Sequence, residues 1–126
     1  MAKTDGGPRK SDALHLDDFS VKQQPNHQTV PKYYGEALLA AARTDSSILA
    51  LTADLTAPTE TDLVRDHLPD QFVMVGIAEA NMVGVGAGLA RAGFIPFVHS
   101  FSVFLSRRSF DQIAMQIAYP KTNVKL

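Results

Sequence analysis

The 126-residue sequence contains no cysteine and no tryptophan. Without cysteine the chain can form no disulfide, no thiolate nucleophile and no zinc–thiolate site. Twelve Lys and Arg residues against thirteen Asp and Glu residues leave a formal charge of -1, so no nucleic-acid partner is expected. The longest apolar stretch is interrupted by Glu79, Asn81 and Arg91, and we therefore expect no segment of about 20 residues that spans a bilayer.

The composition is that of an ordinary soluble globular protein, with 45% apolar and 20% charged residues. The first residues show no apolar core of a signal peptide, and acidic residues such as Asp5 and Asp12 argue against a transit peptide. The compartment expected from these observations is the cytoplasm.

The first thirty residues are polar and rich in residues that break regular structure. Neither a helical nor a strand period persists over residues 1–30, where glycine and proline recur. We therefore expect residues 1–30 to form a flexible arm. From Pro31 onward apolar residues recur with regular periods, which predicts that residues 31–126 belong to the folded domain.

Strand and helix patterns alternate over residues 31–126. Apolar runs predict buried strands at 48–52, 72–75 and 94–98. Amphipathic patterns predict one helix beginning at Pro31 and others over 59–67, 79–92 and 106–118. In the last of these helices, the residues predicted to face inward are Phe110, Ile113, Ala114 and Ile117. The alternation predicts an α/β fold of three layers (α/β/α) with a mainly parallel sheet.

A further strand pattern begins at 123–126, where the sequence stops. A parallel sheet that ends on a new strand would leave an exposed edge and uncovered apolar surface. We therefore expect an incomplete domain, either a fragment or a module completed by another chain.

The predicted helix over 79–92 begins with the one carboxylate of an otherwise apolar segment. Its glycines, Gly84, Gly86 and Gly88, do not form a nucleotide-binding fingerprint, because Leu89 stands where the third glycine is needed. They indicate either tight packing of the helix on the sheet or close approach of a flat ligand. The helix N-terminus stabilises an anion at Glu79 by about 0.3–1 kcal/mol, whereas full burial costs about 4–7 kcal/mol. A buried Glu79 is therefore predicted to be protonated or to share a proton, and an exposed one to act only as a helix cap.

The segment that follows the predicted strand over 94–98 carries a second group of candidate residues. Phe101 and Phe104 lie three residues apart where open α/β sheets place their ligands, and could enclose a flat heterocycle. Arg107 or Arg108 could reach an anion such as a phosphate. The alternative is that both rings belong to the core and both arginines to a solvated helix start. The four histidines show no spacing typical of metal ligands, and of them only His99 lies in this candidate site.

Three consecutive segments, at 76–84, 87–97 and 100–113, together resemble the pyrimidine-binding domain of transketolase-like thiamine diphosphate enzymes. They read GIAEANMVG, AGLARAGFIPF and SFSVFLSRRSFDQI. The resemblance covers residues 33–126 and is greatest to the C-terminal subunit of transketolases that are split over two chains. It implies the N-terminal part of a thiamine diphosphate-binding (pyrimidine) domain.

The resemblance also implies roles for individual residues. Glu79 matches the glutamate that hydrogen-bonds the pyrimidine N1′ of thiamine diphosphate and promotes the imino tautomer of its 4′-amino group. Phe104 matches the aromatic residue stacked on the pyrimidine, and Phe101 its neighbour in the pocket. Asp54 matches an aspartate near the thiazolium ring, and Arg107 an arginine near the substrate in the related deoxyxylulose-phosphate synthases. His99 is placed with Arg107 among the candidate substrate-binding residues.

Two features of the family have no counterpart in this sequence. The histidine found directly after the glutamate, or two residues after it, is replaced by Ala80 and Asn81. The segment that binds magnesium and diphosphate lies in another domain of the family, and the glycines near Asp5 do not match it. The resemblance therefore implies that Mg²⁺ is held by a partner, an N-terminal transketolase subunit, in a dimer of heterodimers.

The function expected from the resemblance is that of a partial transketolase subunit. It would bind and activate the aminopyrimidine of thiamine diphosphate for transfer of a two-carbon unit between sugar phosphates, as in the pentose phosphate pathway, and would not turn over alone. Three alternatives stay open: a deoxyxylulose-phosphate synthase-like fragment, a 2-oxo acid dehydrogenase β-like fragment, and a non-catalytic interaction module. Asp54 and Asn81 favour the split transketolase over the other two enzymes.

Overall fold

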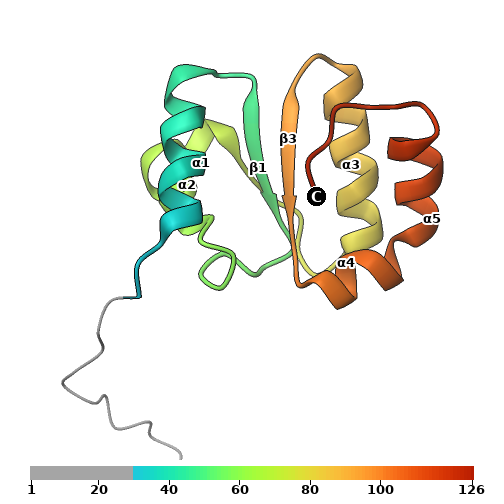
Figure 1. The fold of residues 1–126 in the computed structure, drawn as a ribbon, viewed down its shortest axis with the longest axis horizontal. Helices are drawn as coiled ribbons and strands as arrows, with labels where there is room; N and C mark the ends of the chain where they lie inside the picture. Colours follow the sequence, from blue (N-terminus) through green and yellow to red (C-terminus); the bar gives the residue numbers. More distant parts are fainter. Residues whose placement is uncertain (1–29) are drawn as a thin grey trace, which may run out of the picture. The chain divides into compact units, whose positions relative to one another are not determined.

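The computed structural model describes residues 30–126, so the arm predicted over residues 1–30 lies, apart from Val30, outside the described residues (Figure 1). The described elements are, in order, α1 (Tyr33–Thr44), β1 (Ile48–Thr52), α2 (Asp62–His67), the 3₁₀ turn η2 (Pro69–Gln71), β2 (Phe72–Met74), α3 (Glu79–Arg91), β3 (Ile95–His99), α4 (Ser102–Arg108), α5 (Phe110–Gln112) and the π-helical segment η3 (Ile113–Ala118). Among residues 30–126, none of the helices has both the length and the apolar character needed to cross a membrane.

The three strands form one parallel sheet in which β1 lies between β2 and β3 (Figure 1). Leu51 of β1 is paired with Val73 of β2 and with Val98 of β3. All five residues of β1 are buried, as expected for a central strand that is covered on both faces. The predicted α/β fold with a parallel sheet is therefore confirmed.

Two hydrophobic clusters cover the two faces of this sheet and make the fold three-layered (Figure 1). Alternate residues of β1 face opposite layers, as the two-residue period of a strand requires. One cluster joins α1 and α2 to the sheet through Leu38, Leu39, Ala42, Ile48, Ala50 and Val64. The other joins α3, α4 and η3 to the opposite face, mainly through Leu49, Leu51, Met82, Val83, Ala87, Val98, Leu105 and Ile117.

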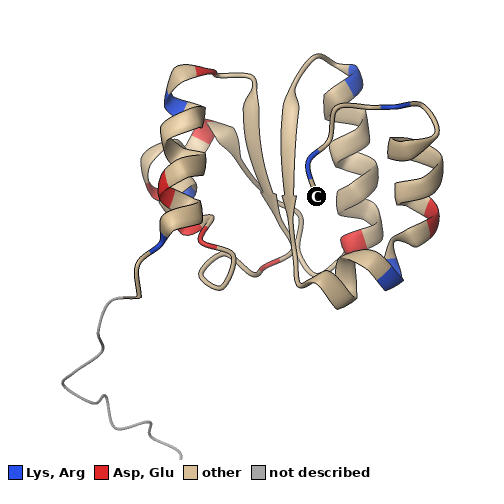
Figure 2. Cartoon of the chain, in the orientation of Figure 1, with Lys and Arg blue, Asp and Glu red and all other residues tan. Residues whose placement is uncertain are grey.

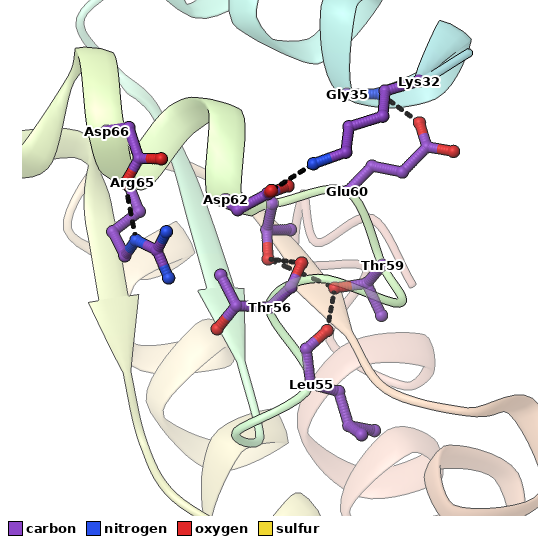
Figure 3. Close-up of polar contacts among 10 residues, drawn as sticks. Lys32, Gly35, Leu55, Thr56, Thr59, Glu60, Asp62, Arg65 and Asp66 are labelled. Atoms are coloured by element: carbon purple, nitrogen blue, oxygen red, sulfur yellow. Dashed lines mark hydrogen bonds and ion pairs between the residues drawn. The ribbon is translucent and has the colours of Figure 1, made fainter. Parts of the chain in front are cut away.

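Helix α2 begins at Asp62, three residues after its predicted start. The backbone of Glu60 has a φ of 59°, which a right-handed helix does not allow, so the chain turns there instead. In this turn the Glu60 carboxylate accepts a hydrogen bond from the backbone N–H of Gly35 at 2.8 Å, and Lys32 pairs with Asp62 (Figure 3). The residue that precedes α1 provides no side-chain cap. The carboxylate of Glu60, in the loop before α2, instead stabilises the first turn of α1.

The single helix predicted over 106–118 is replaced by the consecutive segments α4, α5 and η3. Helix α4 begins earlier, at Ser102, the backbone leaves helical geometry at Ser109 (φ -120°, ψ 15°), and η3 has the wider turn of a π-helix. The break at Ser109 and the π-helical turn of η3 both rotate the side chains that follow away from the positions they would have in one continuous α-helix. Ile117 is buried as predicted, but the prediction for Phe110 is wrong, because its side chain is 71% exposed.

The segment predicted as a further strand, at 123–126, pairs with β3 at one position only. Lys125 forms a parallel bridge with Phe97, donates its backbone N–H to the Pro96 carbonyl at 2.9 Å and accepts the Val98 N–H at 2.8 Å. Pro96 itself keeps the regular register of β3 against β1, so the strand carries no bulge there. The bridge places the end of the chain beside the outer edge of β3.

Candidate functional site

The candidate residues lie at the edge of the sheet where the parallel strands end. Asp54 follows β1, Glu79 follows β2, and the segment from Ser100 onward follows β3. In open α/β sheets this edge is where ligands bind, because the loops that follow neighbouring strands meet there. The structure thus brings three separate parts of the sequence to one edge of the sheet.

The Glu79 carboxylate is the centre of the site. It lies in the first turn of α3 and is only 4% exposed. Nη1 of Arg108 donates to both of its oxygens, at 3.2 Å to Oε2 and 3.3 Å to Oε1, and the Ser100 hydroxyl donates to Oε1 at 3.4 Å. Figure 2 shows an acidic position at the start of α3 and a basic position near the end of α4, the two elements that this ion pair joins.

The protonation state of Glu79 differs from the one predicted for a buried carboxyl. Burial raises the pKa of Glu79, but the hydrogen bond from its own backbone N–H and the hydrogen bonds and charge of Arg108, with a smaller contribution from Ser100, lower the pKa by more. The net pKa lies below that of an ordinary glutamate. Of the two states predicted for a buried Glu79, protonated or sharing a proton with a partner, the protonated one is therefore not favoured, because its own backbone N–H and Arg108 stabilise the anion.

Phe101 and Phe104 lie beside this ion pair. Their ring centroids are 6.0 Å apart with an angle of 42° between the ring planes. The guanidinium carbon of Arg108 lies 4.0 Å from the centroid of the Phe104 ring, a cation–π contact. Phe104 is half-buried and Phe101 is 45% exposed, so neither ring belongs to the closed core. Arg108 is thus the residue that joins the buried carboxylate to the aromatic pair.

Arg108 was a candidate for contact with an anion, but neither Arg108 nor Ser100 was predicted to be a partner of Glu79. Arg107 and Arg108 follow Phe104 by three and four residues, and both spacings place an arginine on the same helix face as Phe104, so spacing alone does not choose between them. The residue chosen from the resemblance, Arg107, is exposed and, among the described residues, forms no hydrogen bond or ion pair with Glu79. Its expected contact with a phosphate stays a prediction.

His99 and Asp54 lie at the same edge of the sheet, but among the described residues neither forms a hydrogen bond or ion pair with Glu79. Nδ1 of His99 lies 3.0 Å from the Leu51 carbonyl oxygen, which can only accept, so Nδ1 carries the hydrogen and Nε2 accepts from the Tyr34 hydroxyl at 2.6 Å. Burial lowers the pKa of His99, which favours this neutral form. Asp54 is exposed and has a φ of 60°. The roles expected for both residues stay predictions.

The glycines of α3 have different environments. A Cβ at Gly86 would lie 3.0 Å from Cγ2 of Val98, so this glycine allows the helix to pack closely on β3. A Cβ at Gly84 would lie 3.2 Å from the Gln116 side chain, whereas one at Gly88 would meet nothing within 4 Å. Close helix–sheet packing therefore accounts for Gly86 but not for Gly88.

Two cavities lie elsewhere in the described residues. One, of about 170 Å³, is lined by Tyr34, Phe97, Val98, His99, Lys125 and Leu126. The other, of about 250 Å³, is lined by Ser102, Leu105, Ser106, Ile113 and Leu126. Neither is lined by Glu79 or Phe104, between which the Arg108 side chain lies. Residues 30–126 contain no group of three or more His, Asp or Glu side chains placed to hold a metal ion.

Comparison with known proteins identifies the family of this chain. The transketolase pyrimidine-binding domain matches residues 26–126. A 6-deoxy-6-sulfo-D-fructose transketolase subunit of Clostridium sp. (strain MSTE9) is 47% identical over 93 residues, which are 74% of this chain and 29% of that protein. A Methanocaldococcus jannaschii protein assigned as a transketolase C-terminal section is 40% identical over 106 residues, which are 84% of this chain and 34% of that protein. 1-Deoxy-D-xylulose-5-phosphate synthases also match.

The fold is similar to that of a solved relative. The split-gene transketolase solved as an inactive β4 tetramer superposes with a TM-score of 0.66 and 43% identity, over 72% of this chain and 30% of that one. The chain thus spans about a third of the length of these three transketolase relatives and 15% of the length of the two 1-deoxy-D-xylulose-5-phosphate synthases. Because the family match covers most of the sequence, the chain belongs to the transketolase pyrimidine-binding domain family.

Proposed function

We propose that this chain supplies the aminopyrimidine half of a thiamine diphosphate site in a transketolase made of two kinds of chain. One observation carries the proposal: a flat N–H donor group already lies over the Phe104 ring while it is hydrogen-bonded to the buried Glu79 carboxylate. That group is the guanidinium of Arg108, 4.0 Å from the ring centroid and 3.2 Å from Oε2 of Glu79. The site therefore offers the two contacts that a flat nitrogen heterocycle requires.

The residues fit the aminopyrimidine by their chemistry. Its ring is planar and apolar on its faces, so it can stack on an aromatic side chain such as Phe104. Its ring nitrogen and amino group need a hydrogen-bonding partner in the plane of the ring, and a carboxylate that is only 4% exposed provides one that water does not compete for. Phe101 extends the aromatic wall beside Phe104.

Each site residue then has a defined part in the proposed reaction. Glu79 holds a proton at the pyrimidine N1′ and orients the ring, while Phe104 and Phe101 fix the ring plane and exclude water. When bound, thiamine diphosphate supplies the thiazolium carbon that accepts a two-carbon unit from one sugar phosphate and passes it to another. Asp54 faces the thiazolium end, and Arg107 and His99 contact the sugar phosphate.

The diphosphate and magnesium part of the site is assigned to a partner subunit. The chain matches about a third of the length of its relatives, one of which is named as a subunit and another as a C-terminal section. We assign Mg²⁺ to an N-terminal transketolase subunit that carries the diphosphate domain, in a dimer of heterodimers. The chain alone is then expected to show no ketol transfer.

The test uses the chain mixed with such a subunit. Binding of thiamine diphosphate is measured by calorimetry and ketol transfer by a coupled assay, for the mixture and for each chain alone. Glu79→Gln keeps the shape of the side chain but removes its charge, and we expect ketol transfer to fall by about 10²–10⁴-fold, the usual contribution of acid–base groups, with a much smaller loss of cofactor affinity.

The matched control is Glu36→Gln, because Glu36 also lies in the first turn of a helix but is exposed. This control should retain full activity in the same mixture. Equal activity of Glu79→Gln and the unchanged chain would refute the catalytic part of the proposal. A mixture that binds no thiamine diphosphate would instead favour a non-catalytic interaction module.

A further inference from the structure

Arg108 occupies both of the contacts that the proposed ligand needs. We propose that Arg108 is a latch: its side chain closes the pyrimidine site of the unliganded chain and must swing away before the aminopyrimidine binds. The inference rests on the proposed function and adds to it a step of regulation at the same residues. It is carried by the geometry of three side chains, Glu79, Phe104 and Arg108.

The first competition is for the carboxylate. Arg108 donates to both oxygens of Glu79, at 3.2 Å and 3.3 Å, and Ser100 adds a third hydrogen bond at 3.4 Å. Because Glu79 is buried in the first turn of α3, it has little freedom to turn toward a second partner. A heterocycle that hydrogen-bonds this carboxylate in the plane of the guanidinium therefore has to displace Arg108.

The second competition is for the aromatic face. The guanidinium carbon lies over the Phe104 ring, 4.0 Å from its centroid, which is well within the range of a cation–π contact. A pyrimidine stacked on the same face needs the same space. One residue thus blocks the hydrogen-bonding partner and the stacking surface at once.

The latch can open because only one of its partners is fixed. The Arg108 side chain is 51% exposed while that of Glu79 is 4% exposed, so the arginine can turn into solvent and keep its charge hydrated. Arg108 also contributes to the lowered pKa of Glu79, against the effect of burial. When Arg108 is displaced, the pKa of Glu79 rises, so the carboxylate becomes more basic and a stronger acceptor for the proton at N1′.

The test uses the full 126-residue chain and thiamine, which carries the aminopyrimidine but no diphosphate and so needs no partner subunit. Thiamine affinity is measured by NMR titration, and the pKa of the Glu79 carboxyl by ¹³C NMR, with Glu79→Gln identifying its signal. The latch predicts that Arg108→Ala lowers the thiamine Kd by about tenfold, equivalent to about 1.4 kcal/mol, and raises the pKa of Glu79. Arg91→Ala, which removes an equal charge from the last turn of α3, should change neither.

A second variant, Arg108→Lys, keeps the test valid if Arg108→Ala fails to fold. Arg108→Lys keeps the charge and loses the flat, forked donor group, so its thiamine Kd should lie between those of Arg108→Ala and the unchanged chain. Equal or weaker thiamine binding by both Arg108 variants would overturn the latch and leave the proposed function standing, as would an unchanged pKa of Glu79. If none of the proteins bound thiamine, and the two-subunit mixture bound no thiamine diphosphate, the proposed function and the latch would both fall.

Discussion

The contact between α1 and the loop before α2 makes Gly35→Ala the most demanding test of the fold. Gly35 is buried in the first turn of α1, where its N–H donates to Oε2 of Glu60 at 2.8 Å (Figure 3). A Cβ at this position would lie 2.4 Å from the Glu60 carbonyl oxygen, 2.8 Å from the Glu60 Cβ and 3.1 Å from Cδ1 of Leu63. The nearest of these atoms belongs to backbone and cannot move aside by rotation of a side chain.

Two effects of opposite sign determine the magnitude of this change. Alanine is preferred over glycine inside a helix by up to about 1 kcal/mol. Overpacking costs about 1–3 kcal/mol. Relief of the clash also moves the Glu60 carboxylate away from the Gly35 N–H and weakens their charge-assisted hydrogen bond, which is worth up to about 1.5–3 kcal/mol. We therefore expect Gly35→Ala to lower the free energy of unfolding by roughly 1–3 kcal/mol, or the melting temperature by roughly 5–15 °C for a domain of this size.

The matched control for this substitution is Gly88→Ala in α3. Gly88 is also helical, but a Cβ there would meet nothing within 4 Å, so only the helix preference remains. Gly88→Ala should raise the free energy of unfolding by about 0.5–1 kcal/mol. Both variants are measured by urea unfolding and thermal melting. A Gly35→Ala protein as stable as the Gly88→Ala protein would refute the contact between Gly35 and Glu60.

Two further predictions concern buried polar groups. Burial lowers the pKa of His99 in the folded chain below its usual 6.5, so the unfolded chain binds a proton at His99 more readily than the folded chain does. Folding therefore keeps the full stability associated with a neutral His99 above about pH 6.5. That part of the free energy of unfolding is lost as the pH falls through the folded-state pKa. Urea unfolding measured between pH 5 and 7.5 should show that the free energy of unfolding falls less on acidification in His99→Gln than in the unchanged chain. An equal fall in both proteins would contradict the lowered pKa of His99. The Oγ of Ser109 is buried and, within residues 30–126, has no hydrogen-bond partner, so Ser109→Ala should raise the free energy of unfolding by about 1 kcal/mol. A loss of stability in the same unfolding assay would show that this hydroxyl is bonded in solution.

The sheet and its layers were predictable because their signal is local. The apolar runs of β1, β2 and β3 follow from residues that are adjacent in sequence, and the alternation with helices determines that the strands are parallel. The start of α2 was not predictable in this way. It depends on the positive φ of Glu60, which is stabilised by a contact with Gly35, twenty-five residues earlier in the chain. The break at Ser109 likewise depends on how α4 and η3 pack on α3.

The candidate site was predictable to a smaller extent. The sequence suggested Glu79, Phe101 and Phe104 because an isolated carboxylate and two spaced aromatics are unusual next to strand ends. Nothing in the local sequence distinguished Arg107 from Arg108. Which arginine meets the carboxylate depends on the phase of α4, and that phase follows from its start at Ser102 rather than at the predicted residue 106.

The charge of Glu79 shows why a site cannot be assigned from the burial of one residue. Burial alone raises the pKa of Glu79, whereas its own backbone N–H, the arginine twenty-nine residues later in the chain and Ser100 together lower that pKa by more. The same arginine is half exposed, so its contribution is the one that can change when another group reaches the carboxylate. In the proposed latch, a buried acid paired with a half-exposed arginine has a lower pKa when the arginine is bound than when it is displaced. The latch predicts that the pKa of Glu79 depends on which group occupies the Phe104 face, and the paired measurement of thiamine affinity and Glu79 pKa tests that dependence.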